Sequence, residues 1–352
     1  MKKVTLCILF FFLLVSFQGE ATERLYVIPP KEGIYHSAHP DFGLRDDDVT
    51  EQRVDSFLQL AEKAVVWSYI SDHWYKGISF PKEACLVLHR KGIIPLIGMM
   101  PWSTLQQNKK ETKYTLDRII KGDFDKELQL YAHEVAALGF PVMIEFGPEA
   151  NGAWFPWSAV WNGGAEKRQY GDSDIPDGPE RFRDAYRHIV SLFRAEGVSN
   201  VTWVFHLASA PWPDKEWNAP RYYYPGDEWV DWIGVSVYGR LRSGEAKPFH
   251  VILKKIYPQL TALSPKKPLA ILEMGVSEER GKQDKAEWIT SAFSHLKTGA
   301  YPRIKAVSWW NKIYRPDGSR SYLEVDSSKS SLSAYRAAVA DLVDRVEWQR
   351  IN

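Results

Sequence analysis

The chain has 352 residues, near the upper end for one domain and typical of a single α/β barrel. Hydrophobic residues make up 45% of it and charged residues 25%, and the formal charge of +1 leaves no basic field that would attract nucleic acid or an anionic membrane. The 15 Trp and 17 Tyr exceed what a core usually needs, so they either fill an unusually aromatic core or provide flat platforms for sugar rings.

The N-terminal segment has the pattern of an export signal. Lys2 and Lys3 form a positive end, an apolar stretch over 4–17 follows, and small and polar residues come next. The apolar stretch is too short for a comfortable membrane span, so we predict a signal peptide over 1–21 and a mature chain over 22–352. An uncleaved anchor is the alternative. We expect a secreted or periplasmic protein with no membrane span after signal removal.

Short apolar segments rich in β-branched residues recur along the rest of the chain. They are continuous runs rather than strict alternations, as expected when both faces of a parallel sheet are buried. The eight predicted strands cover Gly33–Ala38, Ala64–Ile70, Ile93–Met100, Pro141–Phe146, Val201–Ala208, Asp231–Gly239, Pro268–Gly275 and Ile304–Asn311.

Helical patterns lie between these strands. Thr50 stands at an N-cap position, and glycines such as Gly139 and Gly197 stand where helices end. Alternating strands and helices predict a (β/α)8 barrel, and the lack of a linker or low-complexity stretch predicts one domain. The predicted helices cover 49–63, 124–139, 177–197, 284–299 and 330–346.

Two glutamates stand where a barrel would carry its chemistry. Glu149 follows the fourth predicted strand, Glu273 lies at the end of the seventh, and the longest irregular segment, 151–175, follows Glu149. The C-terminal ends of barrel strands meet at one mouth, so the two carboxylates can face each other there. Two carboxylates that flank one bond are what glycoside hydrolysis requires. Glutamates at strand ends can also be structural, and spacing alone does not decide between these readings.

The sequence around both glutamates resembles glycoside hydrolase family 26, the clan A group that includes β-mannanases and mixed-linkage β-glucanases. The resemblance covers essentially the mature chain, with the motifs in the order of that family's strands. Four motifs carry this order: "PEANGAWFPW" (148–157), "DWIGVSVYG" (231–239), "ILEMG" (271–275) and "VSWWN" (307–311). In addition, "GIIPLIGMMPWS" (92–103) and "VTWVFH" (201–206) resemble the β-glucanase branch of the family.

This resemblance implies a (β/α)8 fold and a retaining mechanism. Glu149 would be the general acid/base and Glu273 the nucleophile, with Tyr238 on the sixth strand in contact with the nucleophile. A tryptophan on the eighth strand would form the floor under the sugar, and we expect Trp309 in this role. Trp309 and Trp310 are adjacent on a strand, so only one of them can point into the mouth.

The sequence departs from the family directly before the acid/base. The usual pattern is Arg-x-x-His-Glu, whereas Glu145 and Pro148 stand here in place of the Arg and the His. Proline has no side-chain donor, and a glutamate reverses the charge of the arginine. We therefore expect a shifted substrate preference. One hypothesis is that Glu145 meets a cationic or amino-sugar group of the substrate, and the alternative is that it pairs with a neighbouring Arg or Lys.

Further residues are expected to bind the substrate. Trp154 and Trp157 in the loop after Glu149 can stack on sugar rings, although packing is the alternative for both. His206 ends the fifth predicted strand, where it either donates to a sugar hydroxyl or serves the structure. The remaining predicted substrate contacts are Asn151, directly after the acid/base, and Trp102, which would add a distal subsite.

No cofactor or metal is expected. The sequence contains no GxGxxG, P-loop or GxSxG pattern. The stretch "HSAHPD" (36–41) lacks a third fixed ligand for a metal. Cys85 is the single cysteine of the predicted mature chain, and we expect it to be a buried thiol.

The first functional hypothesis is a secreted, monomeric, retaining endo-β-glycanase that acts on β-mannan or mixed-linkage β-1,3-1,4-glucan. A second hypothesis is a polysaccharide-binding protein, without activity or weakly active, on the same scaffold. The replacements at Glu145 and Pro148 motivate it, and the presence of Glu149, Glu273 and Tyr238 argues against it. A third is a hydrolase of a bacterial exopolysaccharide. In each case the partner is a polysaccharide and not nucleic acid.

Overall fold

The computed structural model describes residues 24–241, 244–279, 284–314 and 320–351. The signal peptide predicted over 1–21 lies outside them. Eight parallel strands form a central sheet in the order β2-β9-β8-β7-β6-β5-β4-β3. They are β2 (Tyr35–His39), β3 (Trp67–His73), β4 (Ile94–Met100), β5 (Val142–Phe146), β6 (Val201–Ala208), β7 (Trp232–Tyr238), β8 (Leu269–Gly275) and β9 (Ile304–Trp310).

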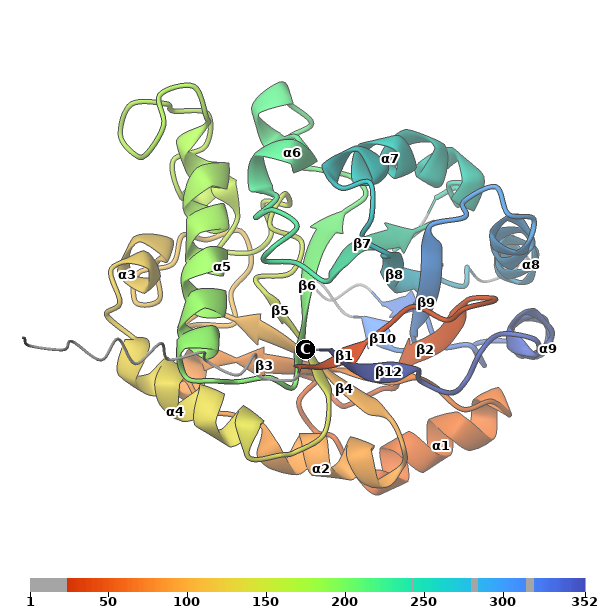
Figure 1. Ribbon diagram of the computed structural model, residues 1–352. Helices are drawn as coiled ribbons and strands as arrows, with labels where there is room; N and C mark the ends of the chain where they lie inside the picture. The colour runs from red at the N-terminus through yellow and green to blue at the C-terminus, as the bar shows by residue number, and fades with distance from the viewer. Residues whose placement is uncertain (1–23, 242–243, 280–283, 315–319, 352) are drawn as a thin grey trace, which may run out of the picture.

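The two end strands of this sheet, β2 and β3, lie side by side and nearly close it into a barrel (Figure 1). The N–H of Val66 donates to the His36 carbonyl (2.8 Å), and the N–H of Trp67 donates to the Ser37 hydroxyl (3.2 Å). The predicted (β/α)8 barrel is confirmed, and each predicted strand corresponds to one strand of the barrel.

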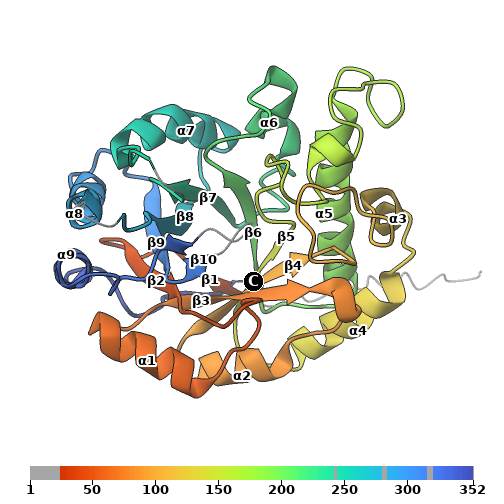
Figure 2. The ribbon, with the colours of Figure 1, turned by 180° about the vertical axis from the view of Figure 1, so that it is seen from behind.

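Helices surround the barrel, as Figures 1 and 2 show from opposite sides. The predicted N-cap is present, since the Thr50 hydroxyl accepts from the Arg53 N–H (3.3 Å). The helices are α1 (Glu51–Ala61), α2 (Lys82–Arg90), α3 (Leu116–Ile120), α4 (Asp125–Ala136), α5 (Asp177–Ala195), α6 (Pro220–Tyr223), α7 (Phe249–Leu263), α8 (Asp284–Lys297) and α9 (Lys329–Val339).

Five helices differ from the sequence prediction, since α2, α3, α6 and α7 are not among the predicted helices and α9 is shorter than predicted. α7 carries Pro258 in its interior, a residue that normally ends or kinks a helix, and no helix was predicted there. α9 ends at Val339 and not at residue 346, because the chain then turns back to the barrel. There the Val343 N–H donates to the Ile34 carbonyl (2.9 Å), which draws the backbone out of the helix.

A small antiparallel sheet covers the end of the barrel where the strands begin. It consists of β1 (Arg24–Val27) and β12 (Trp348–Ile351), which lie across the centre of the barrel in Figure 1. The Val27 carbonyl accepts from the Trp232 indole N–H (2.8 Å), and the Val27 N–H donates to the Thr202 hydroxyl (2.9 Å). Because this sheet closes one end, the opposite end, where the strands finish, is left for the site.

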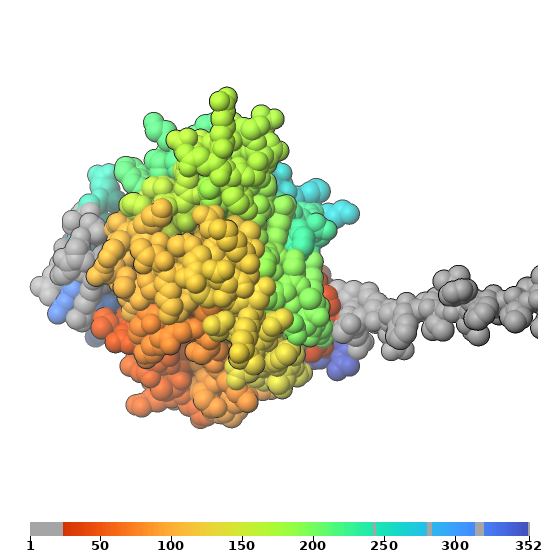
Figure 3. All heavy atoms as spheres, turned by 90° about the vertical axis from the view of Figure 1, so that its left-hand side faces the viewer, coloured from red at the N-terminus to blue at the C-terminus, as the bar shows by residue number. Residues whose placement is uncertain are grey.

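The loops after the strands are long on one side of the mouth. The chain between β4 and the end of α5, coloured from yellow to green, covers this side of the barrel (Figure 3). A short hairpin of β10 (Ile313–Tyr314) and β11 (Ser321–Tyr322) follows β9. Among the described residues, none of the helices combines the length and the apolar character needed to cross a membrane.

Candidate active site

Glu149 lies on a tight turn directly after β5. Gly147 and Glu149 both have left-handed backbone conformations, with φ of 59° and 52°. A Cβ atom at position 147 would press into the rings of Trp157 and Phe182, so this turn requires glycine. A left-handed conformation costs a non-glycine residue about 1–2 kcal/mol. The left-handed conformation of Glu149 is stabilised by the His206 carbonyl on β6, which accepts from the Glu149 N–H (3.1 Å).

Glu273 lies on β8 where this strand is irregular. Register shifts occur against both neighbouring strands within 271–274, and such a bulge re-aims the side chains near it. One carboxylate oxygen of Glu273, one carboxylate oxygen of Glu149 and one ring nitrogen of His206 all lie within 4.8 Å of one another. The fold thus brings together the two glutamates that the sequence places 124 positions apart.

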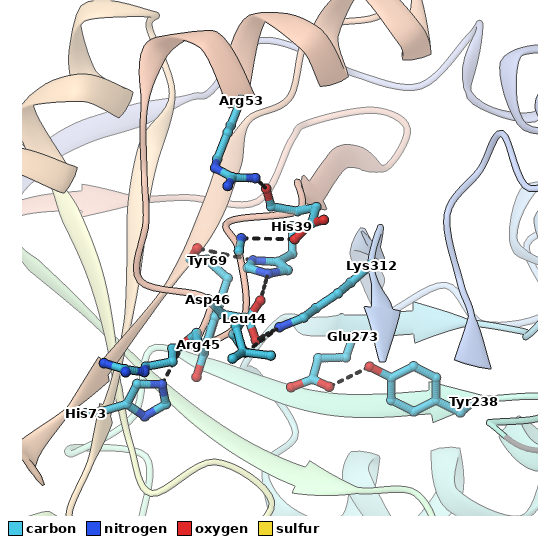
Figure 4. Close-up of polar contacts among 12 residues, drawn as sticks. His39, Leu44, Arg45, Asp46, Arg53, Tyr69, His73, Tyr238, Glu273 and Lys312 are labelled. Atoms are coloured by element: carbon cyan, nitrogen blue, oxygen red, sulfur yellow. Dashed lines mark hydrogen bonds and ion pairs between the residues drawn. The ribbon is translucent and has the colours of Figure 1, made fainter. Parts of the chain in front are cut away.

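Each of the two glutamates has its own hydrogen-bond donor. The Tyr238 hydroxyl on β7 donates to Oε2 of Glu273 (2.7 Å), a contact drawn in Figure 4. The Trp154 indole N–H donates to Oε2 of Glu149 (2.7 Å), and the Trp154 ring remains half-buried beside it. The donors fix the direction in which each carboxylate points.

The surroundings of Glu273 favour retention of a proton. Burial raises the pKa of Glu273, the nearby Glu149 raises it further, and together they bring it to about 8. His206 and the Tyr238 hydroxyl act in the opposite direction. Because the two carboxylates interact, the proton belongs to the pair and not to one residue alone. The pair can therefore hold one proton near neutral pH.

A buried polar layer lies below this pair. Glu145 on β5 accepts from the Tyr69 hydroxyl (2.8 Å), and its other oxygen lies 3.0 Å from Nδ1 of His206. Nε2 of His206 lies 2.8 Å from the Ser236 hydroxyl. Tyr69 reaches Glu145 across β4 because Gly98 has no side chain, and a Cβ atom there would overlap the Tyr69 hydroxyl.

The surroundings of His206 favour its protonated form. Burial alone would lower the pKa of His206, but Glu145, Glu273 and Glu149 outweigh burial and raise it to about 9. Its charge is carried at a position with only 2% exposure.

With this geometry established, the comparison with known families is decisive. The model of glycosyl hydrolase family 26 matches residues 104–306, which is more than half of the chain. The chain belongs to glycoside hydrolase family 26. The resemblance of its motifs to that family is confirmed.

Two characterised proteins are similar to this family 26 chain. Endoglucanase H of Acetivibrio thermocellus is 27% identical over 296 residues, which cover 82% of this chain and 29% of that protein. The mannan endo-1,4-beta-mannosidase of Bacillus subtilis is 26% identical over 178 residues, which cover 51% of this chain and 41% of that protein. The matched part thus spans less than half the length of either relative.

Solved structures share the fold. A Bacillus subtilis mannanase superposes with a TM-score of 0.59 at 17% identity, covering 88% of this chain and 85% of that one. The catalytic domain of an endo-beta-1,4-mannanase from Bacillus sp. JAMB-750 superposes with a TM-score of 0.61 at 18% identity, covering 88% and 86%. At these identities the likeness establishes the (β/α)8 architecture.

The prediction that Glu145 meets the substrate is wrong for this structure. Its side chain is fully buried and both carboxylate oxygens are engaged, one by Tyr69 and one by His206. Glu145 does pair with a basic residue, but its partner is a histidine on the next strand and not the Arg or Lys of the alternative prediction. His206 is likewise not free for a sugar hydroxyl, because both ring nitrogens have protein partners.

The prediction that Trp309 forms the sugar floor is also wrong. Its ring is buried against Trp288 on α8 and Tyr335 on α9, outside the barrel, and its indole N–H donates to the Leu323 carbonyl (2.8 Å). Trp310 faces the interior instead, where it stacks on His39 at a centroid distance of 4.0 Å. The strand alternation required one of the two rings to point inward, and it is Trp310.

Three other predicted contacts serve the structure. Asn151 is buried, and its side chain donates to the Ala208 carbonyl (2.9 Å) and accepts from the Ala208 N–H (2.8 Å), which ties the loop after β5 to the end of β6. Trp157 is buried and donates to the Pro148 carbonyl (2.7 Å). Trp102 is 6% exposed and packs edge-on against Trp157. Of the predicted tryptophans, Trp154 alone keeps a half-buried ring beside a candidate catalytic residue.

A metal ion does not suit this arrangement. Within the part of the chain that the structure describes, Glu149, His206 and Glu273 form the one group with ligand atoms close enough for an ion. A ligating histidine must offer a neutral ring nitrogen. Both nitrogens of His206 are already paired with Glu145 and Ser236, and the raised pKa keeps the ring protonated.

Several residues of the mouth were missed by the sequence reasoning. Ser236 could have been found, because it lies two positions before Tyr238 on β7 and so shares its face. A polar cluster after β2 could not have been found from the sequence. There Asp46 accepts from Lys312 and lies 2.9 Å from His39, in the same view as Glu273 and Tyr238 (Figure 4).

Substitution of the two adjacent tryptophans tests their separate roles. We expect Trp309→Ala to lower the free energy of unfolding by about 3–5 kcal/mol, because it empties a buried site between β9 and two helices. Trp310→Ala should instead raise KM for an oligosaccharide by about threefold to tenfold, through the loss of a ring in the mouth. Denaturant unfolding and substrate-dependent kinetics measure the two effects. A larger KM effect from Trp309→Ala would contradict the placement of the rings.

Proposed function

We propose that this chain is a retaining endo-β-glycanase that cleaves a β-linked polysaccharide by double displacement, with Glu149 as acid/base and Glu273 as nucleophile. The observation that carries the proposal is the separation of the two carboxylates, whose oxygens approach within 4.8 Å. Retaining glycosidases hold their carboxyl groups about 5–5.5 Å apart, whereas inverting enzymes keep about 6.5–9.5 Å between them to admit a water.

In the first step Glu149 protonates the glycosidic oxygen while Glu273 attacks the anomeric carbon. The bond to the leaving sugar breaks, and an ester forms between Glu273 and the sugar that stays. The Tyr238 hydroxyl favours the ionised form of Glu273 by donating to it, which suits a nucleophile. The proton that the pair retains is then available on Glu149 for the leaving oxygen.

In the second step Glu149, now ionised, takes a proton from water. The water oxygen attacks the anomeric carbon, and the ester bond to Glu273 breaks. The Trp154 indole N–H stabilises the ionised Glu149 that this step requires. Two displacements at one carbon restore its original configuration.

The names of the relatives support a proposal for the substrate class. One is named an endoglucanase and another a mannan endo-1,4-beta-mannosidase. The first name describes cleavage inside a glucan and the second cleavage inside a β-1,4-linked mannan, so we propose β-mannan or mixed-linkage β-1,3-1,4-glucan as the substrate class. The rings of Trp154 and Trp310 at the mouth fit such a ligand, since aromatic faces pack well against pyranose rings.

A polymer panel tests both the activity and the two glutamates. Reducing-sugar release is expected on β-mannan or mixed-linkage β-glucan, and we expect Glu149→Ala and Glu273→Ala each to lower it by at least about 10³-fold. Glu166→Ala, on an exposed part of the same loop, is the matched control and should leave the rate unchanged. Polymer binding without release by the unsubstituted protein would contradict the proposal and favour a binding protein. Release from an exopolysaccharide alone would mean that the substrate is an exopolysaccharide and not β-mannan or mixed-linkage β-glucan.

Product stereochemistry tests the mechanism separately. Proton NMR during hydrolysis of an oligosaccharide should show the β-anomer of the new reducing end first, with the α-anomer growing later by mutarotation. The expectation rests on the short separation of Glu149 and Glu273. Initial appearance of the α-anomer would mean a single displacement by water and would overturn the role of Glu273.

We further propose that the protein is exported, through removal of the segment 1–21. Expression of the full chain in a bacterial host should give a periplasmic or secreted product whose N-terminal sequence begins at Thr22. Recovery in the cytosol with residues 1–21 intact would contradict export.

A further inference from the structure

We propose that Glu145 and His206 form a charge-setting pair, in which the buried Glu145 carboxylate keeps His206 as an imidazolium and this cation favours the ionised form of Glu273, the form that attacks. The inference rests on the proposed roles of Glu149 and Glu273 and adds two positioning residues to them. Neither member of the pair touches the substrate, and both act through the carboxylates above them.

The geometry places one cation among three carboxylates. Nδ1 of His206 lies 3.0 Å from Glu145, and a ring nitrogen of His206 lies within 4.8 Å of an oxygen on Glu149 and of one on Glu273. These three acids come from β5, from the turn after it and from β8. Among the described residues they are the charged groups with the largest effect on the ring, and the neutral Ser236 hydroxyl lies on its other side.

Burial makes this cation effective. The side chains of His206 and Glu145 are both fully buried, so solvent screens their charges little. The opposing carboxylate holds the proton on the ring, and the Tyr69 hydroxyl donates to the far oxygen of Glu145. The charge of Glu145 is thus stabilised from two sides, and the charge of His206 follows from it.

Loss of the cation would leave like charges together. Burial and Glu149 already raise the pKa of Glu273, and His206 is the main opposing influence. Without a charge at His206 the pKa of Glu273 would rise further, so its ionised form would appear only at higher pH. The acid limb of the activity profile reports this ionisation in the free enzyme, and it should move upward.

A purely structural histidine is available for comparison in the same barrel. His36 on β2 is also buried, and its two ring nitrogens lie 2.7 Å from the Ala64 carbonyl and 2.8 Å from the Tyr335 hydroxyl. No ion pair joins it to a carboxylate of the described residues, although Asp344 acts on it from farther away, and burial lowers its pKa to about 4. His36→Gln therefore removes an equally buried ring without removing a cation.

The first experiment measures the charge of His206 directly. Proton–carbon NMR of the protein labelled at histidine Cε1, with the His206 signal identified by its loss in His206→Gln, should give a titration midpoint well above 6.5. Glu145→Gln should lower this midpoint by about 1–3 pH units, since an opposite charge at this distance shifts a pKa by that amount. Glu273→Gln should lower it as well, because the coupling is reciprocal. A midpoint at or below 6.5, or one that Glu145→Gln leaves unchanged, would overturn the proposal.

The second experiment follows kcat/KM against pH on a cleaved polymer. His206→Gln and Glu145→Gln should each shift the acid limb upward by about 1 pH unit or more, whereas His36→Gln should lower thermal stability and leave the limb in place. An acid limb at the same pH in the unsubstituted protein and all three variants would contradict the proposed effect on Glu273. If no polymer is cleaved, the proposed function fails, while the NMR titrations of Glu145→Gln and Glu273→Gln still decide the charge-setting pair.

Discussion

The barrel mouth depends on one buried ion pair, between Glu145 and His206. Burial of two charges costs several kcal/mol per ion unless their remaining donors and acceptors are satisfied. Here Tyr69 completes Glu145 and Ser236 completes His206, so the pair joins side chains from β3, β5, β6 and β7 in one hydrogen-bonded layer. The backbone of His206 also accepts from the N–H of Glu149. The same residue therefore holds the turn that carries one candidate catalytic glutamate and supplies charge beside the other.

Much of the fold could be predicted from the sequence because the pattern that encodes it is local. Runs of buried β-branched residues separated by amphipathic helices identify eight strands, and parallel pairing leaves the barrel as the architecture that buries them. Helices α2, α3, α6 and α7 were not predicted, and α7 breaks a local rule. α7 contains Pro258, and the end of α9 is set by the pairing of Val343 with the backbone of β2, which no local pattern encodes.

The site was predictable to a different extent. Their places at strand ends predicted that Glu149 and Glu273 would lie close together, as they do, since topology alone brings strand ends together. The direction in which a side chain points was harder to predict. Trp309 and Trp310 were known to face opposite ways, and Lys305, on the face of Trp309, was a sign that this face is not the barrel interior. Glu145 could not be read correctly, because its partner lies 61 positions later on the next strand.

The two glutamates differ in how the fold holds them, and the difference fits the proposed division of labour. Glu273 sits within a strand, at a bulge, with the Tyr238 hydroxyl to one side, so its position is set by the sheet. A nucleophile must approach one carbon atom from a single direction, which favours a carboxylate held in a fixed position. Glu149 sits past the end of its strand on a left-handed turn, secured by two backbone hydrogen bonds, with His206 and with Gly152, and by Trp154. An acid/base must serve the leaving oxygen and then a water molecule in turn, and a carboxylate that projects from a turn can reach both. Placement of the charge-setting pair beneath them, in the rigid layer and not in the loops, keeps its influence on Glu273 constant while the loop side of the site exchanges leaving sugar for water.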